Sequence, residues 1–306
     1  MAKARALDSR RKSIRSTRKI TRTMELIATA QFRRAMDRAL SAAAYTRRVT
    51  ELVSHLVATG CEVSHPLLEP RTEVRHAAML VLTANRGMCG GYNGSVLRLA
   101  MTQHKELTQL VGAENVDLTV SGKRGISAFQ YRKMKLARTF TKFEDKPTFA
   151  EVDELAQGYL KAYQAGELDR LDVCYTRFEG MASQYAVTET LLPLGMPGSE
   201  EPKSPRATKL ETGNVKTNHA EYEFLPSAES ILDEIVPMSF RVRLFKCFLD
   251  AAVSEQVARM VAMKSATENA DQMISMLSIM YNRARQTAIT NELLEIIAGA
   301  DAISKG

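Results

Sequence analysis

Residues 238–298 read MSFRVRLFKCFLDAAVSEQVARMVAMKSATENADQMISMLSIMYNRARQTAITNELLEIIA and contain neither glycine nor proline. Residues 1–59, at the other end of the chain, also lack both. Glycine costs about 1 kcal/mol and proline about 3 kcal/mol inside a helix, so these stretches predict two long helices. At 1.5 Å per residue, each would form a rod of roughly 90 Å, which needs an apolar partner along its length. We expect each helix to be the partner of the other.

Apolar and small side chains in both stretches recur at the spacing of a helix face. In the C-terminal stretch they keep steps close to a heptad, which favours a left-handed coiled coil. This stripe consists of Leu249, Val253, Gln256, Met260, Met263, Thr267, Ala270, Ile274, Leu277, Tyr281, Ala284 and Ala288. The first stretch carries a matching stripe of Ile20, Met24, Ile27, Gln31 and Ala35. We therefore predict a two-helix coiled coil from residues 1–60 and 231–300, whose helices could run antiparallel because a whole domain connects them.

Between these stretches the hydrophobic period changes to that of a small α/β domain, expected over residues 72–194. Strands are predicted at AAMLVLT (77–83), VDLTVSG (116–122), LDVCYTRFE (171–179) and QYAVTETLL (184–192), with a short one at 136–140. Helices are predicted at 92–110, 126–133 and 151–165. This alternation indicates a largely parallel sheet that ends in a hairpin, an α/β or α+β fold. Residues 195–230 predict a mobile polar loop and connector, with a turn or two of helix at 230–235 before Pro237.

Several classes of protein are disfavoured by composition. No apolar run reaches the 18 residues that a membrane-spanning helix needs, and the basic start has no hydrophobic signal core. The four cysteines, at 61, 89, 174 and 247, form no CxxC pair, so neither a zinc site nor a disulfide framework is indicated. We expect a protein of a reducing, cytoplasmic compartment.

The net charge of +7 is concentrated near the N-terminus. Only Asp8 opposes the run of Lys3, Arg5, Arg10, Arg11, Lys12, Arg15, Arg18, Lys19 and Arg22. Such a one-sided field indicates an acidic partner, which could be nucleic acid, an anionic membrane or an acidic protein face. The alternative is a solvated helix surface.

The end of the C-terminal stretch carries groups with two interpretations. Arg283, Arg285 and Gln286 are either solvated or make charge-assisted hydrogen bonds to acidic loops of an enclosing partner. The LLEII segment that follows adds apolar surface that a free rod end should not display. Five methionines, Met260, Met263, Met273, Met276 and Met280, suit core packing or an adaptable surface, and the two roles can coexist.

No motif predicts a catalytic, metal or cofactor site. NRGMCGGYNG (85–94) follows a strand and precedes a helix, where it could cradle a phosphate or form a tight turn. It is neither a P-loop nor a GxGxxG fingerprint, since no Lys-Ser/Thr pair follows the glycines. The five histidines are scattered, without HExxH or paired ligands.

Four segments together resemble the gamma subunit of the F-type ATP synthase. They are ITRTMELIATAQFRRA, LTANRGMCGGYNG, SEQVARMVAMKSATENA and YNRARQTAITNELLEIIAGA, in the family's order over nearly the whole chain. The resemblance implies an antiparallel coiled-coil shaft inside a hexameric ring of alpha and beta subunits. It also implies a Rossmann-like domain at the foot, on the c-ring and beside the epsilon subunit.

The resemblance also assigns partner-binding residues. Met24 matches the methionine of the family's KITKAM segment, near the acidic lever of the beta subunits. Arg86, Gly87 and Cys89 lie in the DRGLCGG motif, where Asn85 replaces the usual Asp. Arg285 and Gln286 match the pair that contacts the beta catch loop. Three further residues lie near that pair, namely Arg283, Thr290 and Glu292.

The implied function is that of a rotary shaft without a catalytic site or cofactor of its own. Ion flow would turn the c-ring, and the shaft would drive conformational change and ATP synthesis in the beta subunits. The chain would be peripheral to the membrane, on the cytoplasmic side of a bacterial inner membrane, without nucleic acid. The alternative is a basic coiled-coil module that binds nucleic acid, and a nucleotide-using enzyme is a third hypothesis.

Overall fold

The structure is a computed structural model of the 306-residue chain and describes residues 2–58, 66–68, 71, 73–143, 146–194 and 228–304. The chain divides into two compact units, which are described separately below. The first comprises residues 1–30, 88–90 and 256–306, and the second comprises residues 31–87 and 91–255. The expected loop at 195–220 and most of the 195–230 connector lie outside the described residues.

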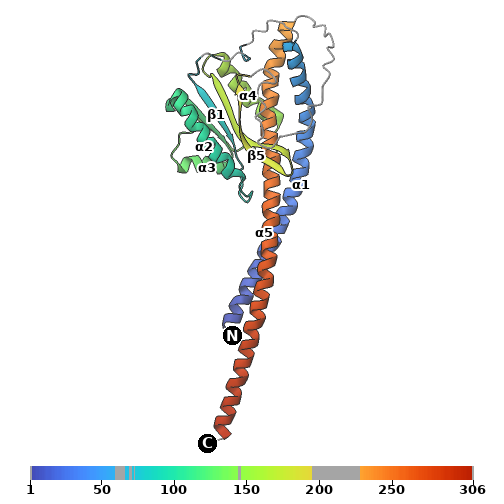
Figure 1. Cartoon of the computed structure of the whole chain (residues 1–306), viewed down its shortest axis with the longest axis vertical. Coiled ribbons are helices and arrows are strands. Elements are labelled where there is room, and N and C mark those ends of the chain that lie inside the picture. The colour runs from blue at the N-terminus through green and yellow to red at the C-terminus, as the bar shows by residue number, and fades with distance from the viewer. Residues whose placement is uncertain are drawn as a thin grey trace. The chain divides into compact units, whose positions relative to one another are not determined.

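Both glycine-free stretches are helical, as predicted (Figure 1). Helix α1 spans Ala2–Ala58 and helix α5 spans Ala228–Ser304. The prediction that a short helix ends before Pro237 is wrong, because α5 continues through this proline. A proline inside a helix costs about 3 kcal/mol. The adjoining Val236 and Phe240 are fully buried, and each such side chain contributes about 1.5–3 kcal/mol, which offsets that cost.

Within the first unit, α1 and α5 run antiparallel. The guanidinium of Arg11 lies 4.7 Å from the ring centre of Tyr281, and Arg18 forms an ion pair with Asp271. Farther along, the hydroxyl of Thr267 donates to that of Thr21 at 2.9 Å. Residue numbers rise on one helix as they fall on the other, so the expected antiparallel direction is confirmed here.

The second unit contains a mixed five-stranded sheet in the order β3-β2-β1-β4-β5. The strands are β1 (Ala77–Leu82), β2 (Val116–Ser121), β3 (Arg138–Phe140), β4 (Arg170–Gly180) and β5 (Ser183–Leu192). Strands β1 to β4 pair in parallel, and β5 pairs antiparallel with β4. The predicted parallel sheet with a terminal hairpin is therefore present.

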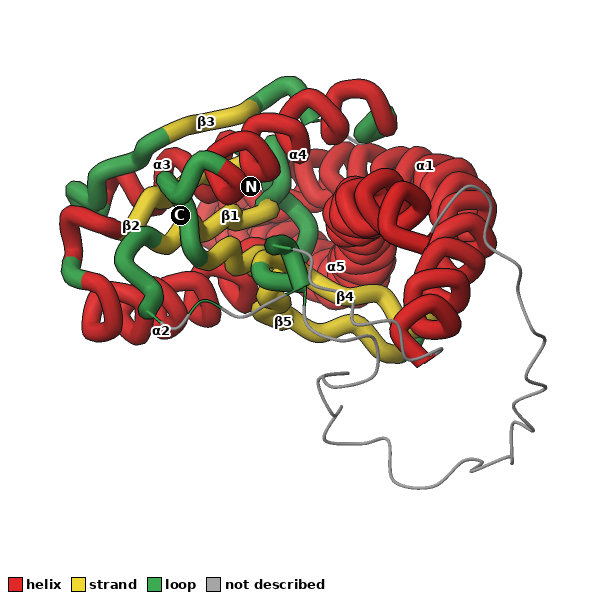
Figure 2. Tube along the Cα trace, turned by 90° about the horizontal axis from the view of Figure 1, so that it is seen from above, coloured by secondary structure: helices red, strands yellow, loops and turns green. Residues whose placement is uncertain are grey.

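Helices cover both faces of this sheet, because successive side chains of a buried strand point to opposite sides. Residues 77, 79 and 81 of β1 face α2 (Tyr92–Val111) and α3 (Lys123–Tyr131). Residues 78, 80 and 82 face α4 (Phe149–Gln164) and the start of α5. Figure 2 shows the strands between α2 and α4. A short 3₁₀ helix at Ala113–Asn115 leads into β2.

A half-buried carboxylate joins the β4–β5 hairpin to α5 within the second unit. Glu189 accepts a hydrogen bond from the Tyr175 hydroxyl at 2.7 Å and from the guanidiniums of Arg177 at 2.7 Å and Arg243 at 3.1 Å. Burial alone would raise the pKa of Glu189, but Arg243, the Tyr175 hydroxyl and Arg177 together hold it below its ordinary value. The three donors therefore stabilise the charged form of this side chain.

Asp250 lies about two helical turns beyond Arg243 on α5 and is buried. Burial raises its pKa from 3.8 to about 6, with Lys246 and Arg177 opposing this shift and Glu189 adding to it. The folded state thus holds the proton more tightly than the unfolded state. The free energy of unfolding should therefore fall as the pH rises from 3.8 through about 6.

We expect Asp250→Asn to stabilise the chain at pH 7, because it removes the cost of a buried charge. The shift to about 6 corresponds to at most about 3 kcal/mol. The difference from the natural chain should disappear at pH 4, where Asp250 is neutral. Urea unfolding at pH 4, 5.5 and 7 measures this effect, and the exposed Glu114, changed to Gln, is the control. Equal destabilisation by Asp250→Asn at all three pH values would contradict the prediction.

Candidate functional site

All five residues expected to bind a partner near the end of α5 are exposed: Arg283, Arg285, Gln286, Thr290 and Glu292. Arg283, Gln286 and Thr290 follow one another at steps of three and four, so they share one stripe of the helix. The Thr290 hydroxyl donates to the carbonyl of Gln286 at 3.0 Å. None of the five side chains forms an ion pair with another residue that the structure describes. Their hydrogen-bonding groups are therefore available to a partner.

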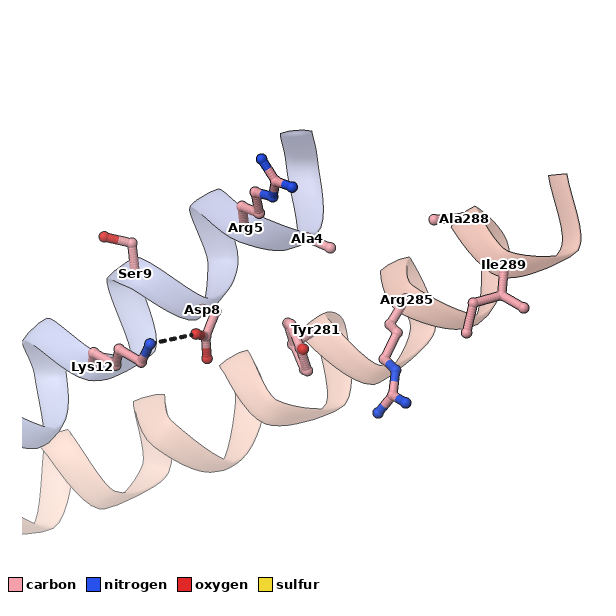
Figure 3. A pocket seen from close by; sticks show the side chains of 9 residues that line it. All are labelled: Ala4, Arg5, Asp8, Ser9, Lys12, Tyr281, Arg285, Ala288 and Ile289. Carbon is pink, nitrogen blue, oxygen red and sulfur yellow. Dashed lines mark ion pairs between the residues drawn. The ribbon is translucent and has the colours of Figure 1, made fainter. Parts of the chain in front are cut away.

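Arg285 also lines a groove of about 590 Å³ between the first turns of α1 and residues 281–289 of α5 (Figure 3). The other lining residues are Ala4, Arg5, Asp8, Ser9, Lys12, Tyr281, Ala288 and Ile289. Three cations thus face a single carboxylate. Hydrogen bonds from Lys12 and Arg11 hold the pKa of Asp8 below its usual range. The groove is therefore basic, which suits an acidic group of a partner.

The N-terminal basic run is partly neutralised within the first unit. Asp8 pairs with Arg11 at 2.6 Å and with Lys12 at 3.0 Å, and Arg22 pairs with Glu25 at 2.8 Å. Arg10, Arg15 and Lys19 are exposed and have no ion pair among the described residues. The sequence pattern did not reveal that Tyr281 lies beside Arg11 or that Asp271 pairs with Arg18, because these contacts join residues 270 and 253 positions apart.

Apolar side chains remain exposed along the last part of α5. Because Arg11 lies beside Tyr281, the first residue of α1 lies opposite about residue 290, and α5 continues to Ser304 (Figure 1). The exposed apolar side chains are Met273, Met276, Ile279, Met280, Ile289, Leu293, Leu294, Ile296 and Ile297. Met263 is buried and contributes to packing, whereas Met273, Met276 and Met280 are exposed. A surface of this kind marks an interaction site.

The three candidate residues of the glycine-rich loop (85–94) differ in burial and in the unit to which they belong. Arg86 is exposed and Gly87 is half-buried, and both belong to the second unit. Cys89 belongs to the first unit and is buried, so it contributes packing rather than a direct contact. Next to it, a Cβ on Gly90 would lie 3.7 Å from that of Ala262 on α5. Met24 is half-buried on α1.

Asn85, where the resemblance implies an aspartate, has a structural role in the second unit. The amide nitrogen of Asn85 donates to the carbonyl of Thr141 at 3.1 Å, and its amide oxygen accepts from the backbone of Lys123 at 3.0 Å. A carboxylate could not donate the first of these bonds. Asn85 therefore ties together the loops that follow β1, β2 and β3.

No group of His, Cys, Asp and Glu within the described ranges is arranged to hold a metal ion. Among the helices of the described residues, none is both long and apolar enough to cross a bilayer.

The family model for ATP synthase matches residues 3–303. This chain belongs to that family. It is 55% identical over 303 residues to the ATP synthase gamma chain of Rhodopirellula baltica, covering 99% of each chain. It is 37% identical to the gamma chain of Chlorobaculum tepidum, covering 97% of each.

Solved structures of ATP synthase chains are similar to this chain in fold. A chain in the mitochondrial ATP synthase of Euglena gracilis, described as OSCP/F1/c-ring, matches with a TM-score of 0.61 at 18% identity. That match covers 99% of this chain and 95% of the other. A rotor chain of the same organism matches with a TM-score of 0.59 at 17% identity, covering 94% and 99%. These matches do not support the alternative of a nucleic-acid-binding module.

Proposed function

We propose that this chain is the rotary central-stalk subunit of an F-type ATP synthase. Ion flow through a c-ring would turn it, and its rotation would drive conformational change and ATP synthesis in the beta subunits. The observation that carries this proposal is its 55% identity to a gamma chain over 99% of both sequences. The antiparallel pairing of α1 and α5 in the first unit supports it.

The proposed shaft comprises residues 1–60 and 231–300, and the proposed foot comprises residues 72–194. The strand order 3-2-1-4-5 with four parallel strands supports a Rossmann-like description of the foot. The partners would be the alpha and beta subunits of the hexameric ring, the epsilon subunit and the c-ring. The chain would be a non-catalytic subunit on the cytoplasmic side of a bacterial inner membrane, peripheral to the bilayer.

Coupling requires that each orientation of the shaft stabilise a different conformation of each beta subunit. A ligand or partner shifts a conformational equilibrium only through its differential affinity for the two states. The exposed residues of the first unit supply that asymmetry, since exposed cations are concentrated on α1 and most of the exposed large apolar side chains lie on α5. Exposed ion pairs are individually worth about 0–1 kcal/mol, which lets the shaft leave one contact for the next.

The nine candidate residues would act in this mechanism as contacts or as supports. Arg283, Arg285 and Gln286 would donate charge-assisted hydrogen bonds to acidic loops of the ring, with Thr290 and Glu292 beside them. Met24 and Arg86 would contact the ring from α1 and from the glycine-rich loop. Gly87 and Cys89 would shape that loop.

We expect the double change Arg285→Ala and Gln286→Ala to lower the coupled turnover of the assembled complex severalfold. The two exposed contacts that it removes are each worth up to about 1 kcal/mol, which together accounts for a severalfold effect. The helicity of the isolated chain should not change, because both side chains are exposed. ATP hydrolysis and synthesis by reconstituted complexes, with circular dichroism of the free chain, measure both effects.

Arg98→Ala is the matched control for this prediction. It removes an exposed arginine from α2, outside the proposed contacts with the ring. Its coupled turnover should equal that of the natural chain. Unchanged turnover of the double variant would refute the assigned role of the pair, and failure of the natural chain to assemble with alpha and beta subunits would refute the proposed function.

A further inference from the structure

A basic surface lies where α3 ends and β3 begins, within the second unit. It consists of Tyr131, Arg132, Lys133, Lys135 and Arg138, all exposed, and is called the α3–β3 patch below. Tyr131 is the last residue of α3 and is 89% exposed, the most exposed of the large apolar or aromatic side chains described. Four cations and one aromatic ring thus share eight consecutive positions.

The α3–β3 patch lacks opposing charge. The sequence contains neither Asp nor Glu from Leu118 to Phe143. None of the four cations forms an ion pair with another described residue, whereas Lys142 pairs with Glu154 at 3.0 Å just beyond the patch. The field of Arg132, Lys133 and Lys135 therefore reaches solvent without an internal ion pair. Arg138 lies beside Gly158 of α4 and shares the surroundings of Tyr159 with Asp117.

Lys133 occupies a backbone conformation that disfavours lysine. Its φ is 57°, in the left-handed region. The backbone N–H of Lys133 donates to Gln130 at 2.9 Å, and that of Met134 donates to Phe129 at 3.1 Å, which is the Schellman pattern that ends a helix. Glycine is the favoured residue at this position because it has no Cβ to clash. The chain therefore carries a charge here at a cost in stability, and such outliers collect at functional positions.

Two structural explanations account for only part of the α3–β3 patch. A cation at a helix C-terminus is stabilised by the helix dipole, and Arg132 also donates to the carbonyl of Ala128 at 3.2 Å. A charged side chain on an edge strand prevents aggregation, which accounts for Arg138 on β3. Neither explains a lysine at the left-handed position, a further lysine at 135, or an exposed tyrosine among them.

We propose that the α3–β3 patch binds an acidic face of a protein partner. Carboxylates of the partner lie opposite the four cations, and Tyr131 packs in a shallow apolar site at the centre of the contact. Tyrosine and arginine are the residues enriched at the energetic centres of protein interfaces. The rigid framework of a helix end, a tight turn and a strand fixes the positions of these groups before binding.

An anionic membrane is less consistent with this surface. Basic segments that bind membranes adjoin a spanning helix or lie on an amphipathic helix whose apolar face enters the lipid. The apolar face of α3 is already occupied, because Phe129 is fully buried and Ile126 packs against the same core. Only Tyr131 remains to contact lipid.

The test uses the full chain in the complex that it forms in native membranes. Tyr131 is replaced by the photo-crosslinker p-benzoylphenylalanine, and the cross-linked peptide is identified by mass spectrometry. We expect a protein segment rich in Asp and Glu. Adding Arg132→Gln, Lys133→Gln and Lys135→Gln should lower the yield about tenfold, since exposed charge pairs contribute modestly but together. Exposed Leu110 on α2, bearing the same probe, is the control and should not give this product.

Lys133→Gly separates binding from folding. Because glycine fits the left-handed position, this variant should raise the unfolding midpoint by about 2 °C while lowering the cross-link yield severalfold. An unchanged yield would overturn the role of Lys133. Cross-linking at Tyr131 to lipid, to a segment without carboxylates, or to nothing would overturn the proposal. None of these outcomes depends on rotation, so the proposed function is tested separately.

Discussion

Gly122→Ala should prevent the sheet of the second unit from forming its native packing. Gly122 lies between β2 and α3 with φ +101°, a conformation that side chains rarely adopt. An added Cβ would lie 2.0 Å from the carbonyl oxygen of Thr83 and 2.6 Å from its carbonyl carbon. These atoms are backbone at the end of the central strand β1, so they cannot move without disrupting the sheet. We expect a loss of about 4 kcal/mol or more.

Gly94→Ala is the control for this prediction. It lies in the first turn of α2, and no atom comes within 4 Å of an added Cβ. Alanine there should stabilise the chain by about 0.5–1 kcal/mol. Urea unfolding followed by tyrosine fluorescence measures both variants, since Tyr92, Tyr163 and Tyr175 are buried in the second unit. A Gly122→Ala chain as stable as the Gly94→Ala chain would show that the turn is not where the structure places it.

Glu189→Gln should destabilise the attachment of the β4–β5 hairpin to α5 by about 3 kcal/mol. The amide keeps the volume of the carboxylate but removes the charge that two guanidiniums share. The side chains of Arg177 and Arg243 are only 19% and 30% exposed, so they would remain poorly solvated without a counter-charge. Removing one partner of a buried ion pair costs about 3–5 kcal/mol, and the partial exposure here favours the lower end.

Glu154→Gln is the matched control for Glu189→Gln. Glu154 pairs with Lys142 at a similar distance, 3.0 Å, but its side chain is 75% exposed. Its loss should change the free energy of unfolding by about 1 kcal/mol at most. Thermal unfolding at pH 7 and low salt measures the stability of both variants. Equal effects of the two substitutions would mean that burial does not strengthen the Glu189 cluster.

The secondary structure of this chain was largely readable from its sequence. The absence of glycine and proline predicted α1 and α5, and the change of period predicted all five strands. Pro237 misled the prediction because a local rule assigns it a helix end. Burial of the adjoining Val236 and Phe240 decided otherwise, and that burial depends on a sheet formed by residues far away in sequence.

The candidate site was only partly predictable. Its residues at the end of α5 came from the resemblance to a family, and the structure adds that all five are exposed. Cys89 belonged to the same motif as Arg86, yet it is buried while Arg86 is exposed. The α3–β3 patch was not singled out, because the strain at Lys133 is a backbone property that no pattern of residue types displays.

The sequence by itself determined which segments are helices and strands, since propensity and hydrophobic period act between neighbours in the chain. Only the tertiary structure decided which charges are neutralised. Arg11, Arg18 and Glu189 find partners on other elements, whereas Arg285 and Lys133 have no ionic partner among the described residues. The physical reason is that an ion pair depends on distance in space, and folding sets that distance for residues that the sequence keeps far apart.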